Sequence, residues 1–159
     1  KAFASLGGYI AGSRTAVRLL QTRARSFIYS TALPPAVLGT NKAALESVSG
    51  TPEAGTALLA KAAELRASLE DLGFHTGNSQ SQIIPIMLDT SHKAQAAQAF
   101  LKEKGVFVPA IRPPTVPRGQ SRLRLSLRAD LEHADWTLLQ TAFKALADHL
   151  GPNVAVEAV

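Results

Sequence analysis

Hydrophobic positions repeat with a helical period most clearly between residues 53 and 72. Leu58, Ala62, Leu65, Leu69 and Leu72 follow one another at intervals of four, three, four and three residues, which places them on one stripe of a helix. Gly73 follows at the position where a helix commonly ends in a left-handed residue. The pattern predicts an amphipathic helix over 53–72 that packs its apolar stripe against a core.

After Gly73 the pattern changes to alternating strands and helices. Pro85 within the first strand indicates a sheet edge or a bulge, because proline cannot donate to a ladder. The pattern therefore predicts that residues 73–159 form a small α/β domain, with helices packed on one face of a short sheet. The expected elements are a strand at 82–88, a helix from Asp89 or Ser91 to about 104, strands at 106–111 and 122–127, and a helix at about 131–149.

The first part of the chain has a different character. Residues 1–34 resemble a piece of a larger layer whose neighbouring strands lie elsewhere, and residues 35–72 are expected to be connecting helices. The expected elements are a short buried strand at 6–12, a helix at 14–25 capped by Ser13, a short strand at 27–29 and a helix at 35–49 that starts at Pro35.

Composition and charge narrow the class of protein. Hydrophobic residues make up 46% and charged residues 18%, which is typical of a folded domain. The net charge of +5 permits a nucleic-acid partner, but the arginines are scattered and the nine aromatic residues (six Phe, two Tyr, one Trp) do not interleave with them. An enzyme that handles small anions explains the charge better. The four histidines are far apart and no cysteine is present, so we expect no metal site.

Nothing in the sequence indicates a membrane or an export route. The apolar runs are too short to span a bilayer, and no basic segment followed by an apolar one opens the chain. The absence of cysteine is compatible with a reducing compartment. We therefore expect a cytoplasmic protein.

The most informative candidate chemistry lies in the loop 112–119 and the strand after it. Three prolines stiffen the loop, so Arg112 and Thr115 have little conformational freedom. Arg122 and Arg124 are two residues apart and share one face of the strand, opposite its leucines. A guanidinium binds carboxylate or phosphate through two parallel hydrogen bonds, but the pattern alone favours a solvated strand face, because charged residues are usually exposed.

Two further positions carry weaker signals. Ser30 and Thr31 offer two hydroxyls and nearby amides to a phosphate, but Ser-Thr pairs are more often turn or cap residues. Lys1 by itself is indistinguishable from a solvated end residue.

Five motifs follow one another along the chain: KAFASLGGYIAGS at 1–13, FIYSTALPP at 27–35, SQIIPI at 81–86, AIRPPTVP at 110–117 and SRLRLSL at 121–127. Together and in this order, they resemble the α-oxoamine synthases, a family of fold-type I pyridoxal-phosphate enzymes. The resemblance implies the C-terminal part of such a transferase. Residues 1–34 would end the large cofactor-binding domain, and 73–159 would form the small C-terminal domain.

The resemblance also implies roles for individual residues. Lys1 matches the catalytic lysine that binds pyridoxal 5'-phosphate and moves protons at the substrate carbon. Ser30 and Thr31 match residues that reach the cofactor phosphate, in the neighbouring subunit of a homodimer. Arg124 matches the arginine that clamps the amino-acid carboxylate, and Arg112 and Thr115 match a substrate-binding loop. Arg122 receives no role and is interpreted as solvated.

The form of the Arg-Pro-Pro-Thr loop is most similar to one branch of this family, which joins L-alanine to a pimeloyl thioester in biotin biosynthesis. The acyl carrier would be coenzyme A or acyl carrier protein. Glycine C-acetyltransferase and 5-aminolevulinate synthase are the alternative branches, and a dimerisation or anion-binding module without catalysis is the alternative class. The resemblance begins at the family's lysine, so we expect part of a longer enzyme that is inactive by itself.

Overall fold

A computed structural model describes residues 3–151 of the chain. The chain divides into two compact units, Lys1–Pro52 and Glu53–Val159. Helix α4 (Pro52–Asp71) lies almost wholly in the second unit, and three of its residues, Ala62, Leu65 and Leu69, are buried there. The segment interpreted as a connecting helix is therefore part of the packed domain, because its apolar stripe supplies one wall of the core.

The second unit is built on a three-stranded sheet with the order β1-β3-β2. The strands are β1 (Ile83–Asp89), β2 (Ala110–Ile111) and β3 (Ser121–Ser126), and both pairings are antiparallel. The predictions of strands at 82–88 and 122–127 are confirmed. Pro85 lies in the edge strand β1, as its missing N–H group led us to expect.

The predicted strand at 106–111 is wrong in its extent, because only Ala110 and Ile111 pair with β3. Val106 and Val108 are buried without belonging to the ladder. The ladder stops where Pro109 accepts a bond from the Arg124 amide at 3.0 Å but has no N–H group to return one. The predicted strand is therefore confined to the last two residues of the segment.

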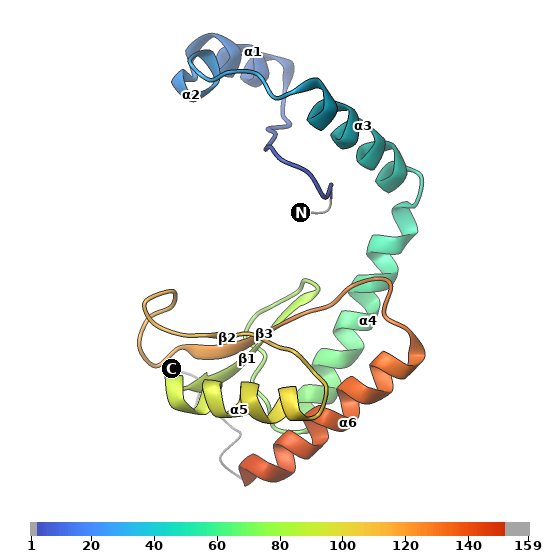
Figure 1. The fold of residues 1–159 in the computed structure, drawn as a ribbon, viewed down its shortest axis with the longest axis vertical. Coiled ribbons are helices and arrows are strands. Elements are labelled where there is room, and N and C mark those ends of the chain that lie inside the picture. Colours follow the sequence, from blue (N-terminus) through green and yellow to red (C-terminus); the bar gives the residue numbers. More distant parts are fainter. Residues whose placement is uncertain (1–2, 152–159) are drawn as a thin grey trace. The chain divides into compact units, whose positions relative to one another are not determined.

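Three helices pack on one face of this sheet: α4, α5 (Ser91–Glu103) and α6 (His133–Leu150) (Figure 1). The cap of α5 is Thr90, whose hydroxyl accepts from the Lys93 amide at 3.2 Å, and neither Asp89 nor Ser91 caps it. Asp89 has a φ of 56° at a register shift between β1 and β3, so it cannot occupy the extended cap conformation.

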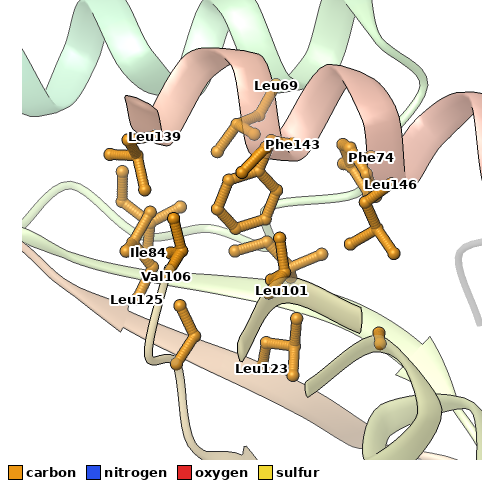
Figure 2. Close-up of a cluster of buried hydrophobic side chains, with 14 of the residues drawn as sticks. Leu69, Phe74, Ile84, Leu101, Val106, Leu123, Leu125, Leu139, Phe143 and Leu146 are labelled. Carbon is orange, nitrogen blue, oxygen red and sulfur yellow. The ribbon is translucent and has the colours of Figure 1, made fainter. Parts of the chain in front are cut away.

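The core lies between these helices and the sheet. Figure 2 shows Phe143 of α6 surrounded by apolar side chains from the other two helices and the strands. Alternate residues of β1 and β3 point into it, which matches the period of two in the sequence. The fully buried large side chains are Phe143, Leu69, Ile84, Ile86, Leu101, Leu123, Leu146 and Val108.

The first unit consists of α1 (Arg14–Arg23), the single turn α2 (Arg25–Ile28) and α3 (Pro35–Ser49). The helices predicted at 14–25 and 35–49 are confirmed, and Ser13 caps α1. The strands predicted at 6–12 and 27–29 are wrong: the first segment is exposed and irregular, and the second lies mostly in the helical turn α2. A strand needs a hydrogen-bonding neighbour, and residues 3–52 provide none.

No residue from 3 to 52 is buried, although this unit carries several large apolar side chains. Leu6, Tyr9, Ile10 and Phe27 are each more than half exposed, at 66%, 78%, 72% and 64%. The segment 6–7 is held locally, since the Asn41 amide donates to the Leu6 carbonyl at 3.1 Å. The helices within residues 3–151 include none that is long and apolar enough to cross a membrane.

Candidate functional site

The face of the sheet opposite the helices carries both arginines of β3. Leu123 and Leu125 are buried, so the residues between and beside them point to the other face. Arg124 lies opposite Pro85 in the register, and Arg122 is flanked by Met87 on β1 and Ile111 on β2. The arginines therefore stand on a partly apolar sheet face, as the alternation in the sequence predicts.

Arg124 is exposed, and its guanidinium makes no hydrogen bond or salt bridge to any residue between 3 and 151. Its backbone is fixed on both sides, because its amide donates to the Pro109 carbonyl and its Cα pairs with Pro85. A cation on a rigid strand with all its side-chain donors available is suited to bidentate binding of a carboxylate.

Arg122 is half-buried rather than solvated, which corrects the interpretation from sequence. Its Nε donates to the Gln120 carbonyl at 2.9 Å, and its Nη2 donates to Gln120 Oε1 at 3.2 Å. Gln120 was not singled out from the sequence. The only signal that could have found it is its position at the end of the proline-rich loop.

The loop 112–119 joins β2 to β3, so Arg112, Thr115 and Arg124 all belong to one hairpin. The Thr115 amide donates to the Arg112 carbonyl at 3.0 Å, which closes a turn at the start of the loop. Both residues are exposed. The structure thus brings three of the predicted site residues together on one element.

Ser30 and Thr31 lie in the first unit, directly after α2 and before α3. The Ser30 hydroxyl donates to the Ser26 carbonyl. Both residues are exposed, and the Thr31 hydroxyl and the Ser30 and Thr31 amides bond to no other described residue. Three free donors at one turn have the chemistry that a phosphate group needs, so these residues fit a phosphorylated cofactor.

Lys1, the predicted catalytic residue, lies outside the described residues. Within 3–151 no group of three His, Cys, Asp or Glu side chains is arranged to hold a metal ion. The predicted site residues that the structure describes therefore carry cationic or hydroxyl side chains.

A match to the family of class I and II aminotransferases extends over residues 1–143. The chain belongs to this family.

Individual relatives show which members of this family the chain is similar to. The chain is 49% identical over 134 residues to the 8-amino-7-oxononanoate synthase of Anaeromyxobacter dehalogenans, covering 84% of this chain and 34% of that protein. It is 43% identical over 155 residues to the enzyme of that name from Geobacter sulfurreducens, covering 95% and 39%. A solved structure of serine palmitoyltransferase, described with a PLP internal aldimine, superposes with a TM-score of 0.82 at 25% identity, covering 95% and 38%.

The chain thus spans little more than a third of the length of these relatives. The fold-type I pyridoxal-phosphate transferase fold expected from the motifs is confirmed by these neighbours. Of the two described units, the second is a small α/β domain on a three-stranded sheet, and the first is a helical segment that precedes it in the chain.

Proposed function

We propose that the chain is the C-terminal part of a pyridoxal-phosphate-dependent 8-amino-7-oxononanoate synthase of biotin biosynthesis. The reaction would be the decarboxylative condensation of L-alanine with a pimeloyl thioester. The observation that carries the proposal is the identity of 49% to a curated enzyme of that name over most of the chain. The Arg112–Thr115 loop and the free guanidinium of Arg124, on one hairpin, support it.

Arg124 would hold the carboxylate of the amino acid. Its strand backbone is fixed by the Pro109 and Pro85 contacts, so only the side chain has to be ordered on binding. Held in this way, the carboxylate has a defined direction relative to the bond that breaks when carbon dioxide leaves.

Arg112 and Thr115 would receive the second substrate, the acyl thioester. Arg124 is committed to the amino acid, and the loop supplies a second exposed cation, Arg112, and an exposed hydroxyl, Thr115. A cation beside an exposed hydroxyl suits a ligand with anionic and carbonyl groups. Whether coenzyme A or acyl carrier protein delivers the acyl group does not alter this assignment.

Pyridoxal phosphate, when bound, supplies the electron sink for carbanion chemistry at the amino-acid α-carbon. Lys1 would hold the cofactor and move the proton at that carbon. Thr31 and the amides of Ser30 and Thr31 would donate to the phosphate. Residues 1–34 would accordingly belong to the large cofactor-binding domain, and the active unit would be a cytoplasmic homodimer that shares residues between subunits.

The test is made on the full-length enzyme that contains this segment. We expect a yellow protein whose colour is abolished by Lys1→Ala, and which condenses pimeloyl thioesters with alanine in preference to glycine and serine. A colourless intact protein would refute the proposal. Preference for glycine or serine would instead assign the enzyme to another branch of the α-oxoamine synthases, such as the one that contains serine palmitoyltransferase.

A further inference from the structure

Arg122 occupies a special place at the base of the loop 112–119. Its Cα pairs with that of Ile111, the last residue before the loop. Its guanidinium holds Gln120, the first residue after the loop, through the bonds of 2.9 Å and 3.2 Å. One residue thus contacts both ends of the segment that carries Arg112 and Thr115.

Gln120 is itself tied to the loop. Its amide donates to the Pro117 carbonyl at 3.2 Å, across a turn in which Gly119 has a φ of 80°. An interaction that holds the Gln120 backbone therefore also orients residues 117–119, the part of the loop that leads into β3. Because the Arg122 donors reach both the carbonyl and the side-chain oxygen of Gln120, the guanidinium fixes the residue in two directions.

The two arginines of β3 differ in how many side-chain hydrogen-bond donors are available to bind a ligand. Arg124 is exposed and all its side-chain donors are free of the residues between 3 and 151, whereas two donors of Arg122 are engaged and its side chain is half-buried. Identical side chains on the same strand face are thus suited to different tasks: Arg124 to binding and Arg122 to holding.

We infer that Arg122 and Gln120 form a clamp that positions the loop 112–119 for the acyl thioester, and that Arg122 is a positioning residue rather than a ligand-binding one. This inference rests on the proposed function for the identity of the substrate. The clamp acts through Arg112 and Thr115, so its loss weakens binding of the acyl substrate. Binding of the amino-acid carboxylate by Arg124 is not affected.

The experiment compares Gln120→Ala, Arg122→Lys and Gln120→Glu in the full-length enzyme. A lysine at position 122 keeps the charge but lacks the planar set of donors that bonds to the carbonyl and the side-chain oxygen of residue 120 together. A glutamate at position 120 keeps the side-chain acceptor. We expect KM for pimeloyl-CoA to rise about tenfold in Gln120→Ala and Arg122→Lys, the effect of losing one charge-assisted hydrogen bond. Gln120→Glu should recover the parent KM, and the dissociation constant of alanine should not change. Arg128→Gln, an exposed arginine beyond β3, is the control and should behave as the parent.

An unchanged KM in Gln120→Ala and Arg122→Lys would overturn the inference. So would an equal weakening of the binding of alanine and of the thioester. A second measurement does not depend on activity: amide hydrogen exchange in residues 112–119 should quicken in Gln120→Ala and Arg122→Lys, while exchange in β1 and β3 stays as in the parent. If the parent enzyme condenses nothing, the proposed substrate is wrong, yet the exchange data still decide whether the clamp holds the loop. Equal loop exchange in parent and variants would refute the clamp itself.

Discussion

Phe74 and Phe143 meet edge to face in the core of the second unit, with ring centroids 5.8 Å apart and ring planes at 90°. Phe74 follows the end of α4, and Phe143 lies in the middle of α6 and is fully buried. The pair joins the segment after α4 to α6, which is far away in sequence, and its geometry is one that the aromatic quadrupole favours.

Phe143→Ala is therefore expected to destabilise the second unit by about 3–5 kcal/mol, since it removes a large buried side chain and leaves a cavity. Phe107→Ala, at a side chain that is 73% exposed, should change the free energy of unfolding by less than about 0.5 kcal/mol. Urea unfolding followed by fluorescence of Trp136, the single tryptophan of the chain, measures both. Similar values for the two variants would contradict the core described here.

Gly73 ends α4 in a left-handed conformation with a φ of 86°. The Phe74 amide donates to the Leu69 carbonyl at 3.0 Å across this residue, which closes the helix end. Gly73→Ala should cost about 1–2 kcal/mol, because an L side chain is strained there. Gly50 ends α3 with a φ of −78°, so Gly50→Ala is the matched control.

At Gly50 an alanine meets only ordinary contacts and restricts the unfolded chain, so the change should be neutral or slightly stabilising. Thermal unfolding of both variants compares the two helix ends directly. Equal destabilisation would show that loss of glycine, and not the sign of φ, decides the cost.

Asp130 receives two hydrogen bonds of 2.9 Å from the Arg128 guanidinium. The side-chain bond from Arg128 lowers the pKa of Asp130 below its ordinary value of 3.8, despite a smaller opposing effect of desolvation. Arg128→Ala should raise this pKa toward the ordinary value, as measured by an NMR titration of the Asp130 carboxyl carbon.

The lowered pKa of Asp130 determines how the ion pair makes the stability of the fold depend on pH. The pair stabilises the fold above the pKa of the unfolded carboxyl, and the contribution is lost as pH falls through the lower pKa of the folded state. Both groups are exposed, so added salt should reduce the difference between parent and variant. A pKa that does not respond to Arg128→Ala would exclude the ion pair in solution.

Arg124→Lys tests the proposed amino-acid clamp. A lysine on the same strand keeps the charge but offers no planar pair of donors, so kcat/KM for alanine in the full-length enzyme should fall roughly tenfold to a hundredfold. Steady-state kinetics with varied alanine at saturating thioester measure the change. Activity equal to that of the parent would show that another group holds the carboxylate.

Local periodicity predicted much of the second unit. The apolar stripe from Leu58 to Leu72 identified α4, and the alternation at 122–127 told correctly which side of β3 faces the core. Positions such as Gly73 were recognisable because a single residue type satisfies the backbone conformation there. The predicted site residues Arg112, Thr115 and Arg124 came from their motifs, and the structure places all three in the β2–β3 hairpin.

The sequence by itself determined which residues of the second unit face the core and approximately where α4, α5 and α6 begin and end, because these depend on neighbours three or four positions away. Only the tertiary structure decided that β2 is limited to Ala110–Ile111 and that segment 27–29 lies mostly in a helical turn. It also decided that Arg122 holds Gln120, whereas the Arg124 side chain bonds to no residue between 3 and 151. Strand pairing and the choice of a hydrogen-bond partner depend on groups brought together by folding, and the periodicity of one segment carries no information about them.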